Sequence, residues 1–366
     1  MVTICNLLLA LLLASFSTTH GWYINQDGKA RSKSSQYSAH VIFGMPWVES
    51  YGHQRLRLLW ESKPFELVSE IMEAVIVKKA PRPLLHFGGC SEMVFDTMFA
   101  PLFSSEPHTL DIPPPERQQT KTSFALKVAY RGTDFCGWQT QLNNDILPSV
   151  QKSLEDHLAL LEGSRVDVRV SGRTDAGVSA IGQVCRFRSR NIISKDALMD
   201  HMESFPMSRS LRCLEAKSVS ESFHPTFGTK FRAYVYMIDD MSIPDLEIER
   251  LDNMLRLLES ETLDYVGVSY GKVTTSSTYC TLRCARAFPV ISSERRSICI
   301  QLIGDRFLRR MVRLLVATAL SLSLERKDCS ALLDLVRQQD RTLASKAAPP
   351  DGLIFIGADF DSTVRQ

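Results

Sequence analysis

The sequence predicts an α+β fold for the region that begins near residue 120. Two short segments, 124–130 and 166–170, alternate apolar side chains with polar or small ones, as β-strands do. Between them, residues 150–161 place apolar side chains on one stripe of a helix. At 366 residues, with 44% hydrophobic and 23% charged residues, the chain is long enough to bury the core of one large or two ordinary globular domains.

The first 120 residues divide into a signal-like leader, 1–22, and an extension, 23–120, that ends in a linker. The run from Leu8 to Phe16 has the length of a secretory hydrophobic region and is too short to span a membrane. From 21 to 45, basic residues mix with serines and only Asp27 is acidic, as in organelle transit segments. We therefore expect delivery to an organelle, either a plastid by bipartite import or a mitochondrion. The alternatives are a true secretory leader, a leader that is an artefact of the gene model, and a cytoplasmic location.

The rest of the extension carries no recognisable chemistry. Apolar residues from Leu67 to Val77 predict a helix, and three prolines at 113–115, followed by polar residues, are typical of a linker. We place a boundary after residue 120 and expect two lobes beyond it, 121–228 and 229–366.

The elements after this boundary follow in order. The first strand pattern ends in a turn at 131–134. Ser149 is a suitable N-cap for the helix, and Gly163 ends it. The second strand pattern, 166–170, leads directly into the loop 171–178. The segment richest in chemistry therefore lies at the end of a strand.

Loop 171–178 combines a carboxylate, an arginine and two glycines. Gly172 and Gly177 allow a tight turn and leave room for a ligand against the main chain. Asp175 would then project into a cleft, where Arg173 can contact phosphate, position Asp175 or keep it ionised. The alternative is structural: a loop in which the aspartate and the arginine only stabilise a tight turn would have the same residues.

The arginines are clustered, although the formal net charge of +2 does not by itself indicate a polyanionic partner. Six arginines between 165 and 190 are accompanied by two acids, Asp167 and Asp175. Eight between 283 and 313 are accompanied by Glu294 and Asp305. Segments of this kind indicate a local surface for a polyanion.

Two further patterns in the second half of the chain, an arginine stripe and a pair of tyrosines, each allow a structural and a functional interpretation. A helical wheel through 306–313 places four arginines on one face: Arg306, Arg309, Arg310 and Arg313. A solvated charged face is the ordinary explanation of this stripe. The functional alternative is a nearby anion, such as a phosphate group or Asp175, because four arginines without an intervening acid repel one another. On the strand pattern 231–238, Tyr234 and Tyr236 share one face, either for core packing or for stacking on an unpaired base.

Nine cysteines, scattered from Cys5 to Cys329, do not form the paired framework of a small secreted protein and favour a reducing compartment. Cys280 and Cys284 lack a second pair of ligands at the spacing of a zinc site. We treat them as ordinary thiols and predict no metal site.

The loop motif GRTDAGV is one of an ordered series of motifs. YRGTDFCGWQ begins at Tyr130 and SVQKSLE at Ser149; FRAYVYMI begins at Phe231, FLRRMVR at Phe307, and RTLASKAAPPDGLIFIGADF closes the series. Together these segments closely resemble the signature regions of the TruA-type tRNA pseudouridine synthases, over about residues 122–361. An isolated GRTD would be weak evidence, but several motifs in the family's order indicate homology.

The resemblance assigns roles where the motifs match. Asp175 occupies the position of the catalytic aspartate, and Arg173 that of the motif arginine. Tyr234 matches the tyrosine that stacks on the target base, and Arg313 the arginine that faces the aspartate. One departure is Thr226, which stands where the family usually has an arginine.

The resemblance also implies the architecture and the reaction. The expected pseudouridine synthase fold has a mixed, largely antiparallel sheet, helices on one side, and a cleft between two lobes that meet near residue 228. The expected reaction converts uridine to pseudouridine in tRNA, in the anticodon stem-loop region, and the expected assembly is a homodimer. No cofactor is needed, because the reaction involves no redox change and no group transfer. Asp175 would act ionised, as nucleophile or as base, and Arg313 would favour that form.

Two other functions fit parts of the sequence. A protein of the same fold that has lost catalysis would bind RNA as a tRNA chaperone, although the retained Asp175, Arg173, Tyr234 and Arg313 argue against this. A nucleosidase would need a second acidic group, and none recurs in these motifs. Product analysis separates the three, since a nucleosidase releases free uracil and a chaperone makes no covalent change.

Overall fold

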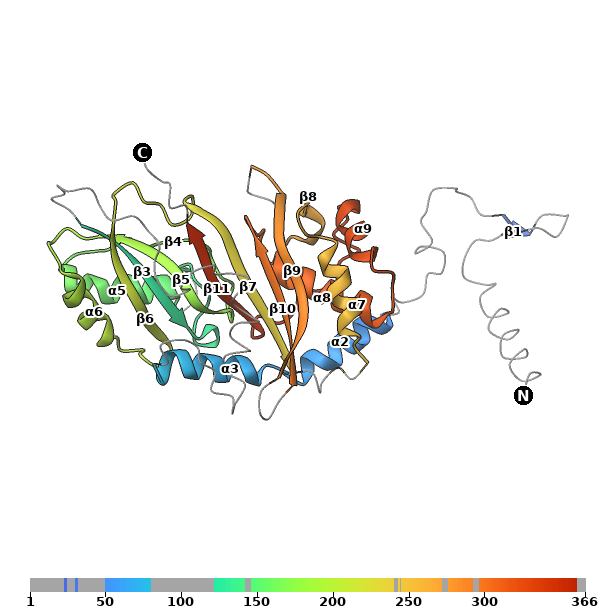
Figure 1. The fold of residues 1–366 in the computed structure, drawn as a ribbon, viewed down its shortest axis with the longest axis horizontal. Helices are drawn as coiled ribbons and strands as arrows, with labels where there is room; N and C mark the ends of the chain where they lie inside the picture. The colour runs from blue at the N-terminus through green and yellow to red at the C-terminus, as the bar shows by residue number, and fades with distance from the viewer. Residues whose placement is uncertain are drawn as a thin grey trace. The chain divides into compact units, whose positions relative to one another are not determined.

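The computed structural model describes residues 23–24, 30–31, 50–79, 122–141, 146–239, 243, 245–271, 276–291 and 296–360 (Figure 1). The chain forms two compact units, residues 1–49 and 50–366. In the first unit, β1 (Tyr23–Ile24) pairs antiparallel with β2 (Ala30–Arg31). The predicted leader lies outside the described residues. No helix in the described part of the chain is long and apolar enough to cross a membrane.

A nine-stranded sheet organises the second unit. Its strands are β3 (Ser123–Tyr130), β4 (Arg169–Val170), β5 (Ser179–Arg188), β6 (Leu211–Val219), β7 (Thr229–Asp239), β8 (Thr262–Asp264), β9 (Tyr279–Ile291), β10 (Arg296–Gly304) and β11 (Leu353–Phe360). Their order is β6-β3-β5-β11-β7-β10-β9-β8, and β4 pairs with β5 outside this path. The prediction of a mixed, largely antiparallel sheet is confirmed.

The last strand joins the two halves of the sheet. β11 pairs parallel with β5, where Ile354 lies opposite Ser179, and antiparallel with β7 on its other side. A Cβ atom at Gly182 would lie 2.1 Å from the carbonyl oxygen of Ile356, so only glycine permits this close approach. Because β5 begins directly after the loop 171–178, its pairing with β11 brings that loop beside β7.

The helices flank the two ends of the sheet. They are α5 (Val150–Glu162), α6 (Lys195–Glu203), α7 (Ile248–Arg256), α8 (Met311–Leu324) and α9 (Ala331–Gln338). In Figure 1, α5 and α6 lie by the β3–β6 half, and α7, α8 and α9 by the β8–β10 half; α6 packs on β6 and α7 on β9. The prediction for α5 is confirmed: the Ser149 hydroxyl accepts a hydrogen bond from the Lys152 amide, and Gly163 ends the helix at φ +65°.

Part of the predicted extension belongs to the same compact unit as the sheet. α2 (Tyr51–Glu61) packs on α8, α3 (Glu66–Met72) packs on β7, and a π-helical turn, η1 (Glu73–Val77), packs on β3. The expected helix within 67–77 is therefore confirmed. These elements run along the lower edge of the sheet in Figure 1.

Aromatic and ionic contacts fix this segment to both halves of the sheet. The rings of Trp60 and Phe65 each lie 6.1 Å from the ring of Tyr236 on β7. At the other end, Glu73 forms an ion pair with Arg131 at 2.9 Å. The Val75 carbonyl also accepts a hydrogen bond from Arg212 at 3.0 Å. Residues 50–79 thus bridge the two halves of the sheet.

Two histidines stack where α5 meets α6. The rings of His157 and His201 lie 4.0 Å apart, and each ring Nε2 donates to the other residue's backbone carbonyl at 2.8 Å. The Nδ1 atom of His157 is buried and has no hydrogen-bond partner among the described residues. Burial lowers the pKa of His157; the hydrogen bond to the His201 carbonyl opposes this shift, and the charge of His201 adds to it. The folded protein therefore holds His157 neutral.

We expect the free energy of unfolding to fall when the pH drops below about 6.5, the ordinary histidine pKa. The unfolded state binds a proton at His157 at a higher pH than the folded state does, so this contribution is complete above that value and is lost as pH falls toward the lower folded pKa. Urea unfolding between pH 7.5 and 5 should show a shallower pH dependence for His157→Gln than for the wild type. Identical slopes would contradict the assignment.

Candidate active site

The loop 171–178 connects β4 to β5 and is held from beneath by a buried glutamine. Gln183 on β5 accepts a hydrogen bond from the Ser171 hydroxyl at 2.7 Å and donates one to the Gly172 carbonyl at 2.7 Å. Its amide also donates to the Tyr130 hydroxyl at 3.3 Å. The start of the loop is therefore fixed by a side chain with no solvent exposure.

The segment 130–139 forms the next support of the loop. The Tyr130 hydroxyl lies 2.8 Å from the Thr174 hydroxyl, and burial raises the pKa of Tyr130 to about 12, which keeps it protonated. The Trp138 amide donates to the Thr174 carbonyl at 3.1 Å. Gly137, at φ +109°, would bring a Cβ atom to 3.0 Å from the Ala176 nitrogen. These contacts explain why two motifs distant in sequence act as one structure.

Asp175 and Arg313 meet across the joined halves of the sheet. Nη1 of Arg313, on α8, lies 2.9 Å from Oδ2 of Asp175. Nε of Arg313 donates to the Ala348 carbonyl at 2.7 Å, and the Ala348 amide donates back to the Arg313 carbonyl at 3.0 Å. Within the described residues, no hydrogen bond or ion pair reaches Oδ1 of Asp175. The carboxylate is thus held by one oxygen and has the other available.

Tyr234 lies on β7 near the loop, in an aromatic cluster. Its ring makes edge-to-face contacts with Phe307 and Phe355 at 5.1 and 5.0 Å, and the residue is 7% exposed. Burial raises the pKa of its hydroxyl well above the usual value, so the phenol stays neutral. A Cβ atom at Gly172 would lie 3.9 Å from this hydroxyl. The ring is held rigidly, and the stacking role stays a prediction.

Arg173 differs from its neighbours in the loop. Its side chain is exposed, and it forms no hydrogen bond or ion pair with the described residues. The guanidinium is therefore available to a ligand.

The prediction of a single arginine-bearing helix through 306–313 is wrong. α8 begins at Met311, and Arg306, Arg309 and Arg310 precede it. Arg310 adopts a left-handed conformation at φ +58°, which cannot continue a helix. The prediction for the apolar residues of this segment is correct, because Leu308, Met311, Val312 and Leu315 are buried.

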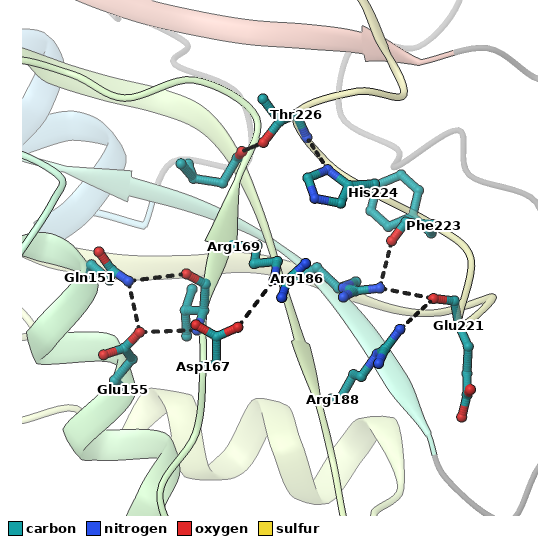
Figure 2. Close-up of polar contacts among 12 residues, drawn as sticks. Gln151, Glu155, Asp167, Arg169, Arg186, Arg188, Glu221, Phe223, His224 and Thr226 are labelled. Atoms are coloured by element: carbon teal, nitrogen blue, oxygen red, sulfur yellow. Dashed lines mark hydrogen bonds and ion pairs between the residues drawn. The ribbon is translucent and has the colours of Figure 1, made fainter.

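The arginines around 169–188 serve mainly as structural anchors (Figure 2). Arg186 donates to the carbonyls of Glu221 and Phe223 at 3.0 and 2.7 Å, and Arg188 donates to Glu221 at 3.0 Å. Arg169 pairs with Asp167 at 3.1 Å. Burial, with the charges of Arg188 and Arg169, lowers the pKa of Arg186. Arg186 and Arg188 are thus occupied in holding the loop before β7, whereas Arg173 in the same predicted polyanion surface is exposed.

Thr226 has a structural contact of its own. Its hydroxyl donates to the Val170 carbonyl at 2.6 Å, and its amide donates to Nδ1 of His224 at 3.2 Å (Figure 2). The threonine that replaces the family's usual arginine therefore ties this turn to the end of β4.

The sequence reasoning missed Arg232, which lies two residues before Tyr234 on β7. Its guanidinium donates to three backbone carbonyls: Ser171 at 2.9 and 3.1 Å, Thr226 at 2.9 Å and Asp305 at 2.8 Å. Three segments that border the site are joined by this one side chain. The strand periodicity along 231–238 could have identified it, because residues two apart on a strand share a face and Arg232 therefore lies on the same face as Tyr234.

No cluster of three or more His, Cys, Asp or Glu side chains that could hold a metal ion occurs in the described part of the chain. The chemistry available at the site is that of a carboxylate, several guanidinium groups and a neutral phenol.

Comparisons with known proteins agree with one another. A family model described as tRNA pseudouridine synthase matches residues 265–361. The chain is 31% identical over 249 residues to tRNA pseudouridine synthase A of Rhodospirillum rubrum, covering 65% of this chain and 87% of that protein. It is 29% identical over 245 residues to the protein of the same name in Afipia carboxidovorans, covering 65% and 99%. The corresponding protein of Buchnera aphidicola is 27% identical over 246 residues, covering 65% and 91%.

We expect Gln183→Leu to lower the free energy of unfolding by about 1–3 kcal/mol, because it leaves the buried Ser171 hydroxyl without its partner and removes the hydrogen bond to the partly buried Gly172 carbonyl. Urea unfolding measures this effect. Gln338→Leu, at the exposed end of α9, is the matched control and should change stability by less than about 0.5 kcal/mol. Equal stabilities of the two variants would show that Gln183 does not hold the loop.

Proposed function

Since the chain belongs to the TruA-type family of tRNA pseudouridine synthases, we propose that it isomerises uridine to pseudouridine in transfer RNA with Asp175 as the catalytic carboxylate. The enzyme class is isomerase. The observation that carries the proposal is the arrangement of Asp175, with Oδ2 bound to Arg313 at 2.9 Å and Oδ1 without a protein partner among the described residues.

The reaction requires few catalytic groups from the protein. The bond between N1 and C1′ breaks, the uracil rotates, and a bond forms between C5 and C1′. A proton leaves C5 and N1 gains one, so the product has the composition of the substrate and no cofactor is required. Asp175 can serve as nucleophile or as base, and both roles use an ionised carboxylate with a free oxygen. The Arg313 guanidinium stabilises that negative charge while leaving Oδ1 available.

Substrate binding falls to the residues around this carboxylate. The target uridine must be extruded from the folded RNA, at a cost of about a few kcal/mol, and then held at the site. We assign Tyr234 to contact with the uracil, Arg173 to the RNA beside it, and Arg313 to the alignment of Asp175. The Arg173 side chain is exposed and has no partner among the described residues, and the Tyr234 ring lies in a rigid aromatic setting; both observations support these assignments.

The remaining features of the proposal come from the resemblance. They are uridines of the anticodon stem-loop region as targets and a homodimer as the active assembly. A further feature, an organelle as the location, comes instead from the leader 1–22 and the basic, serine-rich segment after it. Each stays a prediction.

We expect the full chain to form pseudouridine in unmodified tRNA and Asp175→Asn to lose this activity by about 10³-fold or more, because asparagine offers neither a nucleophilic carboxylate nor a base. Pseudouridine mapping of the RNA product measures both proteins and reports the target position. Asp156→Asn, on the exposed face of α5, is the matched control and should keep wild-type activity.

Three outcomes would contradict the proposal in different ways. Tight tRNA binding without any covalent change would favour the RNA-binding alternative. Release of free uracil would indicate a nucleosidase. Full activity of Asp175→Asn would leave the isomerase in place and remove Asp175 from its catalytic role.

A further inference from the structure

An exposed tyrosine, Tyr270, contacts two arginines, and one of them lies near the proposed catalytic carboxylate. Tyr270 follows the short 3₁₀ helix η5 (Val266–Val268), and 43% of its surface is exposed. The guanidinium carbon of Arg310 lies 4.0 Å from its ring centre, and that of Arg309 lies at 5.3 Å. The Tyr270 amide donates to the Arg309 carbonyl at 3.0 Å, which pairs the two loops. Stacking on an aromatic face restricts the directions an arginine can take.

Arg310 is held close to Asp175 without forming a hydrogen bond to it. Its Nε lies 3.8 Å from Oδ2 of Asp175, which is beyond hydrogen-bond distance, and Arg313 already binds the same oxygen at 2.9 Å. The Nε atom is buried and has no hydrogen-bond partner among the described residues. The Arg310 side chain forms no hydrogen bond with the described residues and is held by its stacking on Tyr270 and by the charge of Asp175, so its hydrogen-bond donors are available to a ligand.

The backbone at Arg310 supports the same conclusion. A non-glycine residue at φ +58° carries strain of about 1 kcal/mol or more, and such strain tends to persist at functional sites. The left-handed conformation ends the incoming loop and directs Arg310 to the ring of Tyr270 and to Asp175 together.

The local charge identifies the missing partner as an anion. Arg173, Arg310 and Arg313 lie on or beside the loop that carries Asp175, so three positive charges accompany one carboxylate. RNA carries one phosphate on each side of every internal nucleotide. The Arg310 side chain is 33% exposed although its Nε is buried, so the exposed part of the guanidinium is suited to bind such a group through hydrogen bonds.

We propose that Arg310 binds a backbone phosphate next to the target uridine and that Tyr270 is a positioning residue that holds Arg310 for this contact. The inference rests on the proposed function, because it takes tRNA as the substrate. It adds a phosphate-binding side chain and an aromatic support to the site.

The test is the salt dependence of tRNA binding by the full chain. Each phosphate contact contributes about 0.7 to 0.9 to the slope of log K against log salt concentration. Arg310→Gln should lower the magnitude of this slope by about that amount, whereas Arg310→Lys keeps the charge and should restore most of it. Arg326→Gln is the matched control, because this exposed arginine follows α8 at its other end, about 20 Å away, and pairs with Glu247. Its slope should equal that of the wild type.

The role of Tyr270 is tested by a double-mutant cycle. Tyr270→Phe keeps the aromatic face and should bind as the wild type does, whereas Tyr270→Leu should reduce the slope. In the background of Arg310→Gln, Tyr270→Leu should have no further effect, because the residue acts through Arg310. Tyr279→Leu, an exposed tyrosine on β9, controls for the loss of a surface ring.

The outcomes separate this inference from the proposed function. An unchanged salt slope in Arg310→Gln would overturn the phosphate contact and leave Arg310 as a second counter-charge for Asp175. Additive effects of Tyr270→Leu and Arg310→Gln would overturn the positioning role. Since the slope is read from binding alone, a wild type that binds tRNA and makes no pseudouridine would overturn the proposed function and not this inference.

Discussion

The ion pair between Asp175 and Arg313 is the interaction on which the site depends. The two residues are 138 positions apart in sequence, one on a loop and the other on α8. They meet because β11 returns from the C-terminal half of the chain to lie between β5 and β7. The site is therefore a property of the complete sheet, and neither half would form it alone. Residues 50–79, which contact β3, β7 and α8, reinforce the same junction.

The residues around this ion pair are of two kinds: some have all their polar groups hydrogen-bonded, and others do not. Gln183, Tyr130 and Arg232 satisfy the backbone and hydroxyl groups of the loop with buried hydrogen bonds, as a structural core would. Two side chains near Asp175 are less satisfied. Arg173 has no partner among the described residues, and Nε of Arg310 is buried without one. Unsatisfied groups and a strained backbone next to a rigid support are typical of a functional site.

Local sequence patterns predicted the local structure well. The helix from Ser149 to Gly163 has the expected cap at each end, and the glycine-rich loop lies at the end of a strand, as its position after 166–170 indicated. The second strand is shorter than its pattern, with only Arg169 and Val170 paired, although the burial alternates along 166–170 as expected. The periodicity of apolar residues predicts side-chain burial more reliably than it predicts which backbone amides pair in a sheet.

Nonlocal features could not be derived from periodicity. The helical wheel through 306–313 failed because residues 305–310 form a non-helical connection that ends in the left-handed Arg310, although the apolar residues of the wheel are still buried. The approach of Arg313 to Asp175 came only from the family resemblance, since no local pattern encodes a contact between distant segments. The packing of residues 50–79 and the carbonyl contacts of Arg232 likewise depend on partners that the sequence does not mark.

The most direct measurement is the single-turnover rate of pseudouridine formation in Arg313→Gln, compared with the wild type at saturating enzyme. We expect a loss of about 10²-fold or more with tRNA affinity retained, because the arginine acts on the carboxylate; an unchanged rate would contradict the account.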